Sequence, residues 1–95
     1  PAMAMVNLIV RARTFTQAMT EATKLGNELR RVSVGYEVLG PAPAPMTRIR
    51  GEHRVQMFLK GTQRRGMRES VRLALKRYPA LRRRVTVDVD PLTIL

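Results

Sequence analysis

The sequence predicts an α+β fold, a four-stranded antiparallel sheet with two helices on one face, which is the ferredoxin-like plan. Apolar residues alternate in four short segments and recur at helical spacing in two longer ones, in the order β-α-β-β-α-β. Right-handed crossovers with short connections place both helices on the same face. A length of 95 residues and a hydrophobic content of 44% suit one small domain, residues 1–95, with a modest core.

The first strand and the first helix follow directly from periodicity. Residues 6–13 alternate between apolar and polar side chains, which predicts a half-buried strand. From Phe15 the apolar residues recur every three or four positions, which predicts an amphipathic helix capped by Thr14. The outer side of this helix carries a mixed series of charges, and we expect a ladder of ion pairs that leaves the helix close to neutral: Glu21, Lys24, Glu28 and Arg31.

The middle of the chain predicts two strands separated by a stiff loop. Residues 32–39 are rich in β-branched side chains and predict a second strand, which could begin at Tyr36. The alternating prolines of residues 40–45 cannot complete a sheet ladder and favour polyproline II, so they predict a loop that continues through residues 46–50. After a turn at Gly51-Glu52, residues 53–60 alternate cleanly and predict the third strand.

The remaining elements are a basic helix and a short strand. Thr62 could cap a second helix that runs to about Tyr78, where Pro79 stops it. Residues 85–90 alternate valine with polar side chains and predict the last strand, which Pro91 closes. In the ferredoxin-like plan this strand pairs with the first one, while the first and third strands are central.

Motifs for catalysis or cofactor binding fail when their spacing is checked. The chain has no cysteine, which excludes disulfides, thiolate zinc sites and cysteine nucleophiles. The one histidine, His53, has no second histidine at zinc spacing and is expected to be a surface residue, and no Gly-x-Ser-x-Gly elbow is present. Residues 61–66 imitate a phosphate loop, but Met67-Arg68 stands where Lys and Ser/Thr are required. We therefore expect no catalytic residue, cofactor or metal in this chain.

The acidic pair Asp88 and Asp90 has two interpretations. Residues two apart on a strand point the same way, so the pair could hold a cation, although no third ligand lies nearby in sequence. The predicted sheet places them beside the first strand, and we favour ion pairs with Arg11 and Arg13.

RNA recognition by base stacking is disfavoured by the third strand. The RNA-recognition signature needs aromatic residues at three positions that here hold Glu52, Arg54 and Met57. Phe58 alone could offer a ring on the open face, and four aromatic residues in the chain leave little for stacking.

The charge distribution points to a phosphate-binding surface. The chain has 18 Lys+Arg against 7 Asp+Glu, a net charge of +11. Half of the basic residues lie between positions 64 and 84, where Glu69 is the one acid. Solvated helix faces normally mix signs, so this segment favours binding to a polyanion. We expect phosphate contacts from Arg54, Arg64, Arg65, Arg68, Arg72, Lys76, Arg82, Arg83 and Arg84.

The sequence predicts a cytoplasmic protein. No apolar run approaches the ~18–20 residues that a membrane span needs. The apolar residues 1–10 lack the basic stretch and cleavage site of a signal peptide. The absence of cysteine suits a reducing compartment, and a start at Pro1 is consistent with a fragment of a longer protein.

Three segments resemble the C-terminal domain of the bacterial primosomal replication-restart helicases (PriA, primosomal protein N′). They are the proline segment 38–44 (Val-Leu-Gly-Pro-Ala-Pro-Ala), Arg54-Val55-Gln56, and the closing Asp-Val-Asp-Pro at 88–91. Their order and separation match that domain over essentially its whole length. The resemblance implies a fold similar to a small-subunit ribosomal protein. His53 and Val55 stand where the family often has aromatic residues, which leaves a phosphate contact by Arg54 intact but not base stacking.

The resemblance also implies a role in replication restart. The family recognises stalled forks with other primosome proteins, its C-terminal domain contributes to binding branched DNA, and the acidic tail of single-stranded DNA-binding protein docks nearby. The family's ATP and zinc sites lie in other domains, so this chain would be a domain without motor activity. Three functions stay open: fork-DNA binding through phosphates, reception of that acidic tail, and ribosomal-type RNA binding.

Overall fold

The computed structural model describes residues 3–90, and its elements follow the predicted order with one addition. A 3-10 helix precedes the last strand. The elements are β1 (Ala4–Ala12), α1 (Phe15–Arg31), β2 (Tyr36–Ile49), β3 (Glu52–Gly61), α2 (Arg64–Arg77), η1 (Pro79–Arg84) and β4 (Val85–Asp90).

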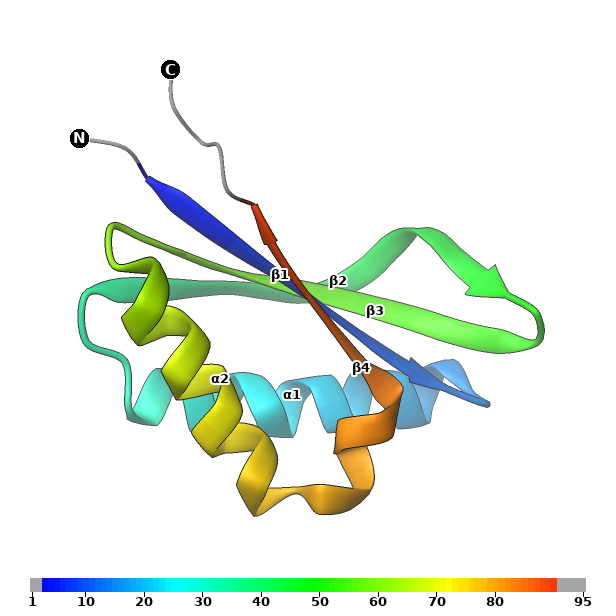
Figure 1. Cartoon of the computed structure of the whole chain (residues 1–95). Coiled ribbons are helices and arrows are strands. Elements are labelled where there is room, and N and C mark those ends of the chain that lie inside the picture. Colours follow the sequence, from blue (N-terminus) through cyan, green and yellow to red (C-terminus); the bar gives the residue numbers. More distant parts are fainter. Residues whose placement is uncertain (1–2, 91–95) are drawn as a thin grey trace.

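The strands form one antiparallel sheet in the order β2-β3-β1-β4, with both helices on the same side (Figure 1). β1 is central because its alternation supplies a fully buried row, and it pairs with β3 and β4 over most of its length. Val10 lies opposite Val55 on one side and Val85 on the other. This arrangement confirms the predicted α+β, ferredoxin-like plan.

The core lies between the helix-facing side of the sheet and the two helices. Leu8 and Val10 of β1 are fully buried, as are Leu25 and Leu29 of α1. Burying such side chains stabilises a fold by roughly 1.5–3 kcal/mol each. No polar or charged residue is buried within the described part of the chain, so all its chemistry lies on the surface.

The proline segment belongs to β2, and the prediction of a loop is wrong. Ala42 pairs with Gln56 and Pro43 with Val55, while register shifts on either side let the strand arch away from β3 (Figure 1). Prolines are tolerated because β2 is an edge strand, whose outward-facing groups need no partner.

Gly40 allows β2 to stay close to β3 at the start of this segment. Its φ of 101° lies in the left-handed region, and a Cβ there would come within 3.1 Å of the Gln56 carbonyl oxygen. The Arg30 guanidinium of α1 donates hydrogen bonds to the carbonyls of Gly40 (2.5 Å) and Val38 (3.4 Å). An arginine of α1 therefore ties the edge strand to the helix layer.

The second helix begins later than predicted but ends close to the predicted position. It begins at Arg64 after Gln63, whose side chain makes no capping hydrogen bond, so the predicted cap at Thr62 is wrong. It ends at Arg77, and Pro79 starts η1, which buries Leu81. Residues 82–84 form the end of η1 and lead directly into edge strand β4.

Candidate nucleic-acid interface

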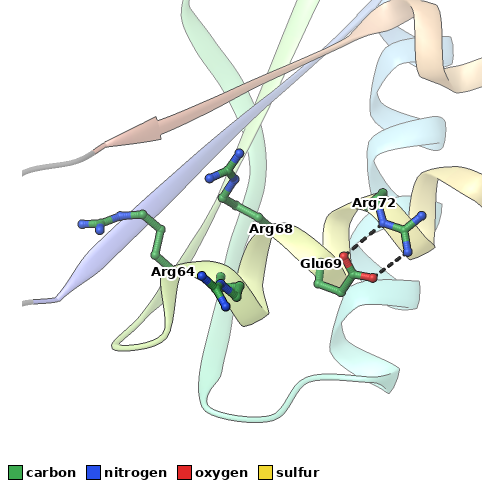
Figure 2. Close-up of a pocket in the computed structure, with 5 residues that line it drawn as sticks. Arg64, Arg68, Glu69 and Arg72 are labelled. Atoms are coloured by element: carbon green, nitrogen blue, oxygen red, sulfur yellow. Dashed lines mark hydrogen bonds and ion pairs between the residues drawn. The ribbon is translucent and has the colours of Figure 1, made fainter.

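The exposed side of α2 is rich in arginine, and its other side packs into the core. Met67, Val71 and Ala74 are buried against the sheet and α1. Arg68 and Arg72 each directly follow a buried residue and are exposed, and Figure 2 shows Arg64, Arg68 and Arg72 projecting from α2. The helix therefore presents a row of guanidinium groups with its apolar stripe turned inward.

Four arginines and one acid line an open hollow of about 540 Å³ at the start of α2: Arg64, Arg65, Arg68, Glu69 and Arg72. The helix has no acidic residue in its first turn and no side-chain cap. The first N–H groups of a helix carry partial positive charge and favour anions. The backbone and the side chains thus both make this hollow suited to an anion.

One arginine of the hollow is engaged by its neighbouring acid (Figure 2). Arg72 donates through Nε to Glu69 Oε2 (3.0 Å) and through Nη2 to Glu69 Oε1 (2.6 Å). This contact lowers the pKa of the Glu69 carboxyl and raises the pKa of the Arg72 guanidinium. Both side chains remain more than half exposed.

A second hollow of about 310 Å³ adjoins the first, between α2 and the inner side of β4. Its rim is cationic, with Arg68, Arg72 and Arg82. Its floor is apolar: Val71, Leu75, Val85 and Val87. Val87 faces the helix layer but is 40% exposed, because α2 does not extend over the β4 edge.

Arg84 is a structural residue. Its guanidinium forms an ion pair with Glu21 of α1, with Nη2 donating to Oε1 at 2.9 Å, and also donates to the Arg11 carbonyl at 3.2 Å. The side chains of Arg84 and Glu21 are 27% and 21% exposed. The hydrogen bond from Arg84 lowers the pKa of the Glu21 carboxyl, against a smaller opposing effect of burial. Arg84 is therefore the least available of the predicted phosphate contacts.

The ladder predicted along α1 is only partly formed. Glu28 pairs with Arg31 (2.6 Å), as predicted, and also lies 3.8 Å from Arg77 of α2. Glu21, however, forms its ion pair with Arg84 of η1, while Gln17 of its own helix donates a hydrogen bond to its Oε1 (3.2 Å). The acids of α1 thus offset cations of α2 and η1 and link the two helices.

Arg11 of β1 fixes the position of η1. Its guanidinium donates to the Arg83 carbonyl (2.8 Å) and to Thr86 Oγ1 (2.5 Å), and lies 3.8 Å from Glu52. The Arg83 backbone is held in this way while its side chain stays exposed.

The predicted ion pairs of the acidic pair are not formed where the structure describes them. Asp88 lies opposite Asn7, and neither Arg11 nor Arg13 pairs with it in residues 3–90. Asp88 is on the same face of the sheet as Arg11, but it pairs with Asn7, four residues before Arg11 on β1. The side chain of Asp90 lies outside what the structure describes.

Arg54 and Lys76 lie apart from the main cluster. Arg54 is on β3, opposite Arg11, on the sheet side away from the helices, and it donates to the Met46 carbonyl at 3.0 Å. Lys76 lies at the other end of α2 and borders a different hollow, with Glu28 and Arg31. The two adjoining hollows therefore bring together five of the predicted residues, Arg64, Arg65, Arg68, Arg72 and Arg82, whereas Arg83 lines neither of them.

Other kinds of site find little support in residues 3–90. His53 is half-buried, more than the predicted surface position implies, and its ring meets Phe15 edge to face at 6.5 Å. No three histidine or acidic side chains gather there in a way that could hold a metal ion. None of the described helices is both long and apolar enough to cross a bilayer.

The fold and the family are supported by comparisons with known proteins. The de novo designed protein Foldit4 has a similar structure, with a TM-score of 0.65 over 93% of each chain at 17% identity, a likeness of fold alone. The comparison with curated protein sequences gives no match. The sequence profile of the primosomal protein N C-terminal domain matches residues 1–92, almost the whole chain. With the predicted sheet order and both helices in place, the chain belongs to the primosomal protein N C-terminal domain family.

Proposed function

We propose that this domain binds the phosphate backbone of branched or fork DNA without sequence preference, as one part of a larger primosomal helicase. Family membership supports a primosomal replication-restart role. The observation that carries DNA binding is the hollow at the start of α2, which four arginines line on a helix whose N-terminus has no side-chain cap. Arginine forks suit two-pronged contacts with phosphate oxygens.

The chemistry of this surface favours backbone contacts over base contacts. Its lining consists of guanidinium groups and one carboxylate, with no aromatic ring around either arginine-lined hollow. Backbone contacts fix position on a nucleic acid but do not read sequence. A preference for forks would then come from the shape of the junction, presented to this domain by the rest of the parent protein.

The parent protein would supply the motor activity. ATP and zinc would be bound by its other domains, and the assembly would work in the cytoplasm, on the nucleoid. Partners would be fork DNA, single-stranded DNA-binding protein and other primosome proteins.

Binding of the isolated domain to three ligands of equal length tests the proposal. At one salt concentration, labelled fork DNA, linear duplex and structured RNA are titrated with protein. We expect the fork to bind at least as tightly as the duplex, and both to weaken steeply as salt rises. Tighter binding to the RNA would favour ribosomal-type RNA recognition and contradict the proposal.

The second hollow favours one alternative, reception of the acidic tail of single-stranded DNA-binding protein. A tail that carries carboxylates and apolar side chains would match a cationic rim above an apolar floor, with Val87 as its exposed centre. A tail peptide that binds the domain and displaces fork DNA would support a shared surface. A peptide whose affinity is unaffected by Val87→Asp would contradict docking in this hollow.

A further inference from the structure

We infer that Glu69 is an internal competitor for DNA phosphate, because its carboxylate occupies Arg72 in the way a phosphate would. The inference rests on the proposed function and adds a residue that limits affinity at the same surface. Binding is then an exchange, in which a phosphate of the DNA displaces Glu69 from Arg72.

The geometry of the pair is that of a bound anion. Two nitrogens of Arg72, Nε and Nη2, each donate to a different oxygen of Glu69, at 3.0 and 2.6 Å. The same parallel arrangement holds carboxylates and phosphates on arginine forks in general. A phosphate cannot use this edge of Arg72 while Glu69 holds it.

The pair has no evident task in holding the fold together. Its members lie three residues apart on one helix, are 55% and 53% exposed, and connect no two elements. Exposed pairs of this kind contribute little to stability. By contrast, Glu21 links α1 to η1 and Glu28 reaches across to α2. The main consequence of Glu69 is therefore electrostatic, inside the arginine-lined hollow.

The position of Glu69 also sets it apart from the other acids. It is the one acid between positions 64 and 84, and it lines the same hollow as the four arginines. Removing its charge would free the Arg72 fork, so that a phosphate could reach Arg72 without displacing a carboxylate.

Glu69→Gln tests the inference, with Glu37→Gln as matched control. Both variants gain one unit of net charge, but Glu37 is exposed on edge strand β2 and takes part in none of the described ion pairs. In titrations of linear duplex, we expect Glu69→Gln to bind about three- to tenfold tighter, because the phosphate no longer has to displace a carboxylate from Arg72. Glu37→Gln should bind within about twofold of the wild type, because Glu37 holds no arginine of the hollow and its exposed charge is screened by salt.

The Arg72→Ala background separates exchange from simple repulsion. If Glu69 acts by occupying Arg72, then Glu69→Gln in this background should gain no more affinity than Glu37→Gln does. A gain that persists without Arg72 would show through-space repulsion and overturn the inference. Equal binding of duplex by the wild type and Glu69→Gln would overturn this inference but not the proposed function. A wild type that binds no duplex at low salt would overturn both.

Discussion

Removing the arginines of the first hollow should flatten the salt dependence of DNA binding by a calculable amount. Arg65, Arg68 and Arg72 are exposed on one helix, and the described contacts link none of them to another element. Because alanine has the best helix propensity, the triple replacement Arg65→Ala, Arg68→Ala and Arg72→Ala should leave α2 folded.

The magnitude follows from the number of phosphates lost. Each duplex phosphate neutralised contributes about 0.9 to the slope of log K against log salt, so losing three contacts lowers the slope by about 2.7. Between about 50 and about 200 mM salt, the wild type should therefore lose about 40-fold more affinity than the triple variant. Fluorescence anisotropy of a labelled duplex or fork, titrated at several salt concentrations, measures this difference.

A control triple with the same charge decides whether position matters. Arg48 on β2, Lys60 on β3 and Arg13 in the β1–α1 connection are all exposed, and their replacement by alanine removes three charges as well. We expect the control to weaken binding modestly while keeping a steep slope. Equal slopes for the two triples would show that only net charge counts, and a wild-type slope in the α2 triple would refute the phosphate surface.

Three further predictions concern the elements that position this surface. Glu21→Ala should destabilise the domain by about 1–2 kcal/mol, because the half-buried Arg84 loses its ionic partner, which thermal unfolding would show as a lower Tm. The contribution of Glu21 to stability should also be lost in acid, because its pKa is lowered in the folded state. This contribution is complete above the ordinary carboxyl pKa of about 4.3 and disappears as the pH falls through the folded-state pKa. Urea unfolding from neutral to acidic pH should thus show a larger loss for the wild type than for Glu21→Gln. Gly40→Ala should cost about 1–3 kcal/mol through its left-handed φ and the contact with Gln56, and an unchanged urea midpoint would contradict this account of β2.

Local periodicity was sufficient to predict the sheet, because each strand carries its own pattern. β1 buries every second residue from Ala4 to Ala12, and a one-residue slip would turn all of these side chains to solvent. The apolar stripe of α2 similarly fixes which of its arginines are exposed. The hollow at the start of α2 was therefore largely predictable from sequence.

Contacts between distant segments were not predictable in the same way. Arg84 and Glu21 are 63 residues apart, and Arg11 reaches the Arg83 carbonyl across 72. Arg84 looks equivalent to Arg82 and Arg83 in the sequence, and only the packing of η1 against α1 distinguishes it. The prolines of β2 were misjudged for a related reason, since their tolerance depends on an edge position that is set by the whole sheet.

The two ends of α2 show why the first hollow is the strongest candidate for function. Lys76 and Arg77 lie in the last turn, where the helix dipole favours cations, whereas Arg64 lies in the first turn, where it disfavours them. The same N-terminus lacks the side-chain cap that Thr14 gives α1 through its hydrogen bond from the Gln17 N–H. Cations at that end cost the isolated helix a few tenths of a kcal/mol to about 1 kcal/mol each. A bound phosphate would reverse this balance, because it would accept hydrogen bonds at the helix N-terminus and neutralise the arginines together. Under the proposed function, the unfavourable local features of this end of α2 therefore share one explanation, an anion bound there.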